Sequence, residues 1–134
     1  MADKKIQVDV LTLDSVQCAA CGYMMESMAA MPQEVQEIID YKEWSVKTKE
    51  GVAKFTAMKG KVLPTICIEG DIVFPSIIPQ YEELIDAMAA RAKTPELVAK
   101  LKAARDKGFE FGNVEKNLQK AGAGQHTRID SREE

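Results

Sequence analysis

The order in which strand-like and helix-like patterns follow one another along residues 6–91 is the feature that most constrains how this chain can fold. Short apolar runs are typical of buried strands, and apolar residues three and four positions apart are typical of one face of a helix. Here the patterns predict strand, helix, strand, helix, strand, strand and helix, followed by one extra C-terminal helix. A strand–helix–strand opening implies parallel pairing, and the later hairpin adds antiparallel pairing. We therefore expect an α/β fold with a mixed sheet of about four strands flanked by helices.

The bounds of these elements follow from apolar spacing, prolines and turn residues. Strands are predicted at Ile6–Thr12, Trp44–Thr48, Pro64–Glu69 and Ile72–Phe74. Helices are predicted from Cys21 towards Ile38, at Lys49–Met58, at Gln80–Arg91 and from Pro95 to about Lys107. Pro32 falls inside the first helical pattern and removes an intrahelical hydrogen bond, which predicts a kink or two helices that meet near Met31.

Two helical stripes are expected to face the core. The first consists of Met24, Met28, Met31, Val35 and Ile38, and the second consists of Val52, Phe55 and Met58. Met25 lies off the first stripe, where it is a candidate for a partner-binding surface. Methionines at helical spacing are most simply adaptable core residues, so we do not interpret them as copper ligands.

Three parts are expected along the chain. Residues 1–92 form the domain with the sheet, residues 93–119 form a C-terminal helical extension, and residues 120–134 form a flexible tail. The simplest role of Leu97, Val98 and Leu101 is to pack the extension onto the domain. Docking of a partner by the extension, or a homodimer, stays open.

Charge and hydropathy exclude some partners. A net charge of −3 and the absence of a basic block argue against a nucleic-acid surface. The apolar runs are too short to span a bilayer, and the N-terminus lacks a targeting pattern. We therefore expect a cytoplasmic protein that has neither a nucleic acid nor a membrane as its partner.

The clearest chemistry lies in the sequence Cys18-Ala19-Ala20-Cys21. Two cysteines at this spacing can close a small disulfide ring or hold a metal together. The pair follows a predicted strand and precedes a predicted helix, where unpaired backbone N–H groups and the helix dipole favour an anionic sulfur. In a reducing compartment such a pair is more often catalytic or metal-binding than a structural crosslink.

A metal or iron–sulfur site needs more ligands than this pair supplies. Structural zinc takes four protein ligands, and two thiolates are half of that set. The remaining candidates are Cys67, in the predicted third strand, and His126, in the predicted tail. We expect Cys67 to be a small buried apolar residue and His126 to be solvated. No metal and no cofactor are therefore predicted for a single chain, and a site shared between two chains stays open.

With these elements in this order, the chain resembles the thioredoxin superfamily and is most similar to its small glutaredoxin-like members. Three matches carry the resemblance, which covers about residues 6–91. The Cys18–Cys21 pair lies between the first strand and the first helix. Leu63-Pro64-Thr65 precedes the third strand, where the family has its cis-proline and threonine, and the segment 66–74 matches the family's strand–turn–strand hairpin.

The resemblance implies a thioredoxin-like fold and a thiol–disulfide oxidoreductase. Cys18 would be the nucleophile that forms a mixed disulfide with the substrate, and Cys21 would be the thiol that resolves it. Pro64 in the cis form would lie against the pair, and backbone groups of Leu63 and Thr65 would align an extended substrate. The partners would be a protein or small-molecule disulfide and an unknown reductant.

The chain departs from the family's pattern at three places. Gln17, and not a Trp, precedes Cys18. Ala19 and Ala20 stand between the cysteines, where thioredoxins have Gly-Pro and glutaredoxins often have Pro-Tyr, so the redox potential cannot be carried over. Thr12 stands roughly where thioredoxins have a buried acid that assists proton transfer, so the sequence offers no counterpart to that acid. Two alternatives remain, a protein that binds or carries a metal or iron–sulfur cluster and a non-catalytic thioredoxin-fold interaction module.

Overall fold

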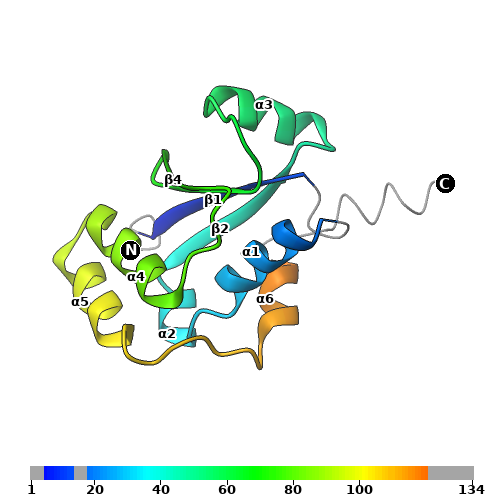
Figure 1. Cartoon of the computed structure of the whole chain (residues 1–134). Coiled ribbons are helices and arrows are strands. Elements are labelled where there is room, and N and C mark those ends of the chain that lie inside the picture. Colours follow the sequence, from blue (N-terminus) through cyan, green and yellow to red (C-terminus); the bar gives the residue numbers. More distant parts are fainter. Residues whose placement is uncertain (1–4, 14–17, 121–134) are drawn as a thin grey trace.

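A four-stranded sheet with the order β2–β1–β3–β4 forms the centre of the molecule in the computed structural model, which describes residues 5–13 and 18–120 (Figure 1). The strands are β1 (Ile6–Thr12), β2 (Ile39–Ser45), β3 (Thr65–Ile68) and β4 (Asp71–Pro75). β1 pairs with β2 in parallel, whereas β3 is antiparallel to both β1 and β4. The predicted α/β fold with a mixed sheet is thus confirmed.

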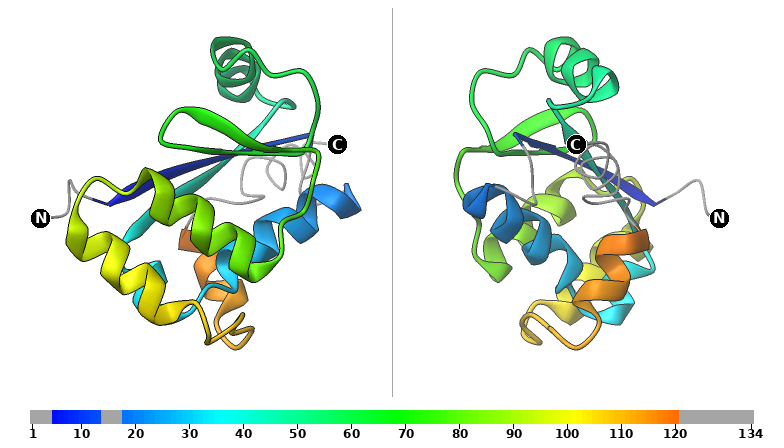
Figure 2. Two further views of the ribbon diagram at one scale, coloured as in Figure 1. Left: turned by 60° about the vertical axis from the view of Figure 1, so that its left-hand side comes forward. Right: turned by 90° about the vertical axis from the view of Figure 1, so that its right-hand side faces the viewer.

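Helices cover both faces of this sheet. They are α1 (Ala19–Ala29), α2 (Gln33–Gln36), α3 (Lys49–Ala57), α4 (Tyr81–Arg91), α5 (Pro95–Ala104) and α6 (Val114–Lys120). α3 lies by itself on one face, and the other helices gather on the opposite face (Figure 2). Within the described ranges, no helix is both long enough and apolar enough to cross a membrane.

The main core lies on the face with several helices. Val8 and Val10 of β1, with Ile66 and Ile68 of β3, point into it because alternate residues of a strand share a face. The same cluster contains buried side chains from α1, α4 and α5, among them Met24, Met28, Leu84, Met88 and Leu101. Each large apolar side chain buried in this way contributes roughly 1.5–3 kcal/mol to folding.

The second strand is the largest error of the sequence prediction. It was predicted at Trp44–Thr48, but β2 spans Ile39–Ser45. The apolar spacing predicts a helical stripe that ends at Ile38, whereas α2 already ends at Gln36. Side chains of β2 alternate between buried and outward-facing positions, but the buried positions 43 and 45 hold Glu and Ser and the position between them holds Trp, which obscured this pattern.

Two further assignments of helix faces were wrong, whereas the break at Pro32 is confirmed. α1 ends at Ala29 and α2 begins at Gln33 with Pro32 as its N-cap, so two helices meet near Met31. Met25 is buried, because α1 is covered by α6 as well as by the sheet. Val52 is exposed, because α3 rests on the sheet chiefly through Gly51, whose backbone approaches that of Ser45 too closely for a side chain to fit between them.

The chain beyond residue 92 contributes to the core. α5 was predicted to begin at Pro95 and does so, and Leu97 and Leu101 are part of the core cluster. α6 was not predicted, because its sequence contains few apolar residues. It ends at Lys120, where the predicted tail begins; residues 121–134, with His126, lie outside the described residues.

Side chains and backbone groups from three segments bind the carbonyl groups at the C-terminal end of α1. The Gln36 side-chain amide donates to the carbonyls of Met28, Ala29 and Met31, at 2.8, 3.3 and 3.3 Å. The Asn117 amide of α6 donates to Ala29 O at 2.8 Å, and the N–H of Glu110 donates to Ala30 O at 2.6 Å. A helix end inside the protein requires such partners, since unsatisfied carbonyls are costly.

We predict that Gln36→Leu lowers the free energy of unfolding by about 1–3 kcal/mol, because it removes one hydrogen-bond donor from three buried carbonyl groups. Gln33→Leu is the matched control, since Gln33 is exposed in the same helix. Urea unfolding of both variants measures the difference. Equal stability of the two variants would contradict the role assigned to Gln36.

Candidate dithiol site

The N-terminus of α1 is built around the sulfur of Cys18. Cys18 is the N-cap residue, with an extended backbone (φ −96°, ψ 114°), and its Sγ accepts the N–H of Cys21 at 3.3 Å. Its carbonyl accepts the N–H of Gly22 at 2.9 Å. The first turn of α1, all of which is described, contains no acidic residue. Negative charge on this sulfur is therefore favoured by the helix N-terminus and is not opposed within that turn.

The two cysteines of the pair differ in access. Cys18 is half-buried and Cys21 is fully buried, and all the cysteines are thiols. The N–H of Leu13, directly after β1, donates to Cys21 Sγ at 3.3 Å. This bond ties the helix to the end of the strand. An incoming group from solvent therefore meets Cys18 rather than the buried Cys21.

Pro64 lies at the same end of the sheet as the two cysteines. The Leu63–Pro64 peptide bond is cis, as expected. Thr65 of β3 pairs with Leu11 of β1, so Pro64, one residue before Thr65, is level with Thr12. The residue after Thr12 is Leu13, whose N–H donates to Cys21 Sγ. The structure thus brings the predicted proline and the predicted thiols to one end of β1.

The residues on either side of Pro64 differ in their surroundings. Leu63 is half-buried. The side chain of Thr65 is buried, and its hydroxyl donates to Val62 O at 2.9 Å. Its hydroxyl is therefore used inside the protein, and substrate alignment by the backbone of Leu63 and Thr65 stays a prediction.

Cys67 lies away from this site, on the face of the sheet that α3 covers. It pairs with Asp9, whose carboxylate contacts Lys54 Nζ of α3 at 3.4 Å. Burial, and secondarily the charge of Asp9, raise the pKa of the Cys67 thiol to about 11. This thiol is therefore protonated near neutral pH, which agrees with the expectation of a small buried residue.

A buried carboxylate that the sequence interpretation missed lies beside the end of β1. Glu43 of β2 is 2% exposed, and the Thr12 hydroxyl donates to its Oε2 at 2.6 Å. Ser45, two residues further on, donates its hydroxyl to Leu13 O at 3.0 Å. The expectation that the sequence lacks a buried acid near Thr12 is wrong, because the acid comes from the neighbouring strand. Alternation from Ile39 onward was the signal that could have revealed it.

These groups together can support dithiol chemistry. An accessible thiol, a buried thiol in the same helical turn and backbone donors to both sulfurs suit reversible closure of a disulfide. In the described part of the chain, no group of three or more His, Cys, Asp or Glu side chains could hold a metal ion.

Comparison with protein-family models, with curated proteins and with solved structures finds no match for this chain.

We predict that iodoacetamide at pH 8 alkylates Cys18 in the folded, reduced protein and leaves Cys67 unmodified. A thiol with a pKa of about 11 is ionised in about one molecule in a thousand at that pH, and only the thiolate is nucleophilic. Peptide mass spectrometry measures the modification, and alkylation in denaturant is the control that exposes every cysteine. Equal rates at Cys18 and Cys67 in the folded protein would contradict the assignment.

Proposed function

We propose that this chain is a thiol–disulfide oxidoreductase with a thioredoxin-like fold, in which Cys18 and Cys21 cycle between dithiol and disulfide. The observation that carries the proposal is the pairing of a half-exposed sulfur at a helix N-terminus with a buried sulfur in the same turn. The strand order β2–β1–β3–β4 and the cis Leu63–Pro64 bond beside that turn support the resemblance to the family.

In the first step, the thiolate of Cys18 attacks one sulfur of a substrate disulfide. A bond forms between Cys18 and that sulfur, the substrate disulfide breaks, and the leaving thiolate takes a proton from water. The N–H of Cys21 bonded to Cys18 Sγ supports the thiolate before attack. Cys18 then carries a mixed disulfide.

In the second step, Cys21 loses its proton and attacks the sulfur of Cys18. The bond between Cys18 and the substrate breaks, so two electrons have passed to the substrate and the pair is oxidised. The N–H of Leu13 bonded to Cys21 Sγ favours the thiolate that this step requires. A reductant in the cytoplasm then returns the pair to the dithiol.

Glu43 is the group proposed to accept the proton of Cys21. Glu43 and Cys21 accept hydrogen bonds from two consecutive residues of the chain. Glu43 accepts from the Thr12 hydroxyl, and Cys21 accepts from the Leu13 N–H. A carboxylate inside the protein can take a proton from a buried thiol that bulk water does not reach. Thr12 would hold the carboxylate in place.

The pair is expected to titrate as a single two-electron couple in a dithiothreitol or glutathione redox buffer. Cys18→Ser and Cys21→Ser each abolish the transition, whereas Cys67→Ser retains it as the matched control. Cys21→Ser is expected to accumulate the mixed disulfide on Cys18. A pair that never closes, or protein purified without oxygen that carries stoichiometric zinc or iron on these cysteines, would disprove the proposal.

We predict that Glu43→Gln slows resolution of the mixed disulfide by about tenfold or more near neutral pH, since a positioned base contributes at least that factor. Formation of the mixed disulfide by Cys18 is expected to keep its rate. Rapid acid quench and mass spectrometry separate the two steps, and the pH profile of the second step is expected to change. Glu50→Gln, at an exposed carboxylate of α3, is the control. Equal slowing of both steps would assign Glu43 a purely structural role.

A further inference from the structure

The peptide group between Thr12 and Leu13 lies between the end of β2 and the buried thiol of the dithiol site. Its carbonyl accepts the N–H of Val46 at 2.9 Å, and its own N–H donates to Cys21 Sγ at 3.3 Å. One peptide plane therefore carries a hydrogen bond on each side. Hydrogen bonds linked in this way polarise one another, so the bond from Val46 strengthens the donor that Cys21 receives.

Ser45 holds the next carbonyl of the same segment. Its side chain is fully buried, and its hydroxyl donates to Leu13 O at 3.0 Å and accepts the N–H of Lys47 at 3.1 Å. A hydroxyl has one proton to donate, and the bond from Lys47 leaves that proton for Leu13. The peptide groups on both sides of Leu13 are thus held by β2 and by Val46, the residue that follows it.

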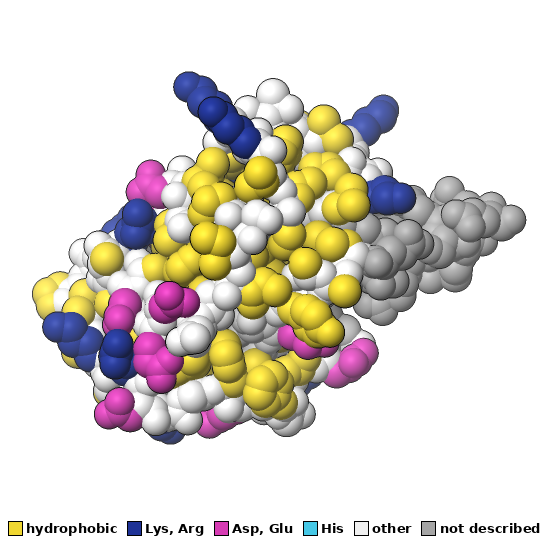
Figure 3. All heavy atoms as spheres, in the orientation of Figure 1, with side chains coloured by type: hydrophobic (Ala, Val, Ile, Leu, Met, Phe, Trp, Pro, Cys, Tyr) yellow, Lys and Arg dark blue, Asp and Glu magenta, His cyan; other side chains and the backbone are white. Residues whose placement is uncertain are grey.

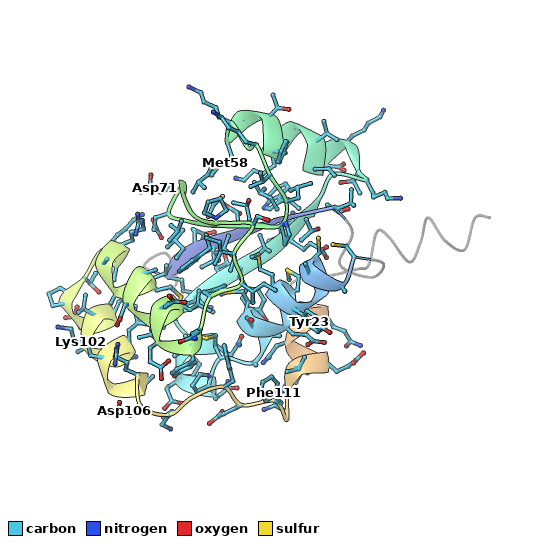
Figure 4. The ribbon with its side chains drawn as sticks, in the orientation of Figure 1. Tyr23, Met58, Asp71, Lys102, Asp106 and Phe111 are labelled. Atoms are coloured by element: carbon cyan, nitrogen blue, oxygen red, sulfur yellow. The ribbon has the colours of Figure 1, made fainter. Side chains whose placement is uncertain are left out.

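Ser45 is itself fixed from the side of α3. Its carbonyl accepts the N–H and the hydroxyl of Thr48 at 3.0 and 2.8 Å. Gly51, in the first turn of α3, lies so close that a Cβ atom there would overlap Ser45 O. α3 and α1 lie on opposite sides of the sheet, as Figure 4 shows with Met58 at the end of the one and Tyr23 on the other. Ser45 therefore connects the start of α3 with the strand end that bonds to α1.

We propose that Ser45 is a positioning residue of the dithiol site, which aims the Leu13 N–H at Cys21 Sγ. The inference rests on the proposed function and deepens it, because it assigns the group that prepares Cys21 for the second step. A hydrogen bond to a thiolate favours it over the thiol, and the bond weakens steeply when the angle at its hydrogen worsens. A Leu13 peptide that is free to turn would therefore leave Cys21 with a weaker donor.

The step that depends on this donor is the attack of Cys21 on the Cys18 sulfur of the mixed disulfide. Cys21 gives up its proton, which Glu43 accepts in the proposed mechanism. The bond between Cys21 and Cys18 forms, the bond from Cys18 to the substrate breaks, and its electron pair leaves on the substrate thiolate. The first step is supported by the Cys21 N–H bonded to Cys18 Sγ. Ser45 is therefore expected to act on the second step alone.

The test compares Ser45→Ala with the unaltered protein and with Ser27→Ala. The Ser27 hydroxyl donates to Tyr23 O at 3.0 Å, so this control loses the same kind of bond within the helix that carries the cysteines. Rapid acid quench and mass spectrometry follow both steps with bis(2-hydroxyethyl) disulfide as the substrate. Ser45→Ala is expected to slow the second step about fivefold, the effect of one lost hydrogen bond, and to move its pH profile to higher pH. The first step is expected to keep its rate, and Ser27→Ala is expected to change neither step.

Two variants of the α3 region show whether that helix fixes Ser45. Thr48→Val removes one donor to Ser45 O without altering a fully buried side chain, and it is expected to slow the second step about twofold. Thr56→Ala is the matched control. Thr56 is exposed on α3, and Lys side chains project into solvent from this region of the molecule (Figure 3), so the variant changes the helix without reaching Ser45.

The amide NMR spectrum of the reduced protein separates the aim of the donor from the stability of the fold. In Ser45→Ala the Leu13 amide is expected to shift and to exchange faster with solvent, whereas the amides that join β1 to β3 keep their protection. A second step that keeps its rate in both Ser45→Ala and Thr48→Val, or equal slowing of both steps, would overturn this inference alone. A pair that never closes in the unaltered protein would overturn the proposed function and this inference with it.

Discussion

The carbonyl groups at the C-terminal end of α1 impose the constraint on which the rest of the structure depends. This end lies inside the protein, so each carbonyl needs a donor other than water. Gln36 supplies a donor from the helix that follows α1 in the chain, and Glu110 and Asn117 supply donors from the C-terminal part of the chain. Because the three segments must meet at one helix end, they also fix the direction in which α1 runs across the sheet. Its N-terminus then lies over the end of β1.

The two ends of α1 have opposite surroundings, and the proposed chemistry depends on that difference. The C-terminal carbonyls are bonded inside the core, whereas the N-terminal N–H groups face a half-exposed sulfur. A helix held firmly at one end can present Cys18 and Cys21 in a fixed geometry at the other. The bond from Leu13 N–H to Cys21 adds a second fixed point at the strand. Backbone donors thus support both sulfurs, without a lysine or an arginine in the first turn of α1.

Local patterns predicted the parts of the fold that local interactions determine. The helix start at Pro95, the break at Pro32 and the hairpin around Gly70 follow from capping, proline geometry and turn chemistry. Contacts between distant segments explain the errors. β2 carries polar residues, Glu43 and Ser45, at buried positions, and α6 is held by Asn117 rather than by an apolar stripe. The cysteines and Pro64 could be named from spacing. The alternation from Ile39 onward indicates that Glu43 faces inward, but its place beside Thr12 depends on which strand pairs with β1.

The segment from residue 108 to α6 connects the C-terminal end of α1 with the start of α4. The N–H of Glu110 and the side-chain amide of Asn117 donate to carbonyl groups at the C-terminal end of α1. Phe109, which precedes Glu110 in the chain, packs its ring against that of Tyr81. Phe111 projects outward from the same short stretch. The bonds that complete the buried end of α1 therefore also set the position of an exposed ring at that end. A change in this segment would shift α1 and, with it, the two cysteines at the other end of the helix.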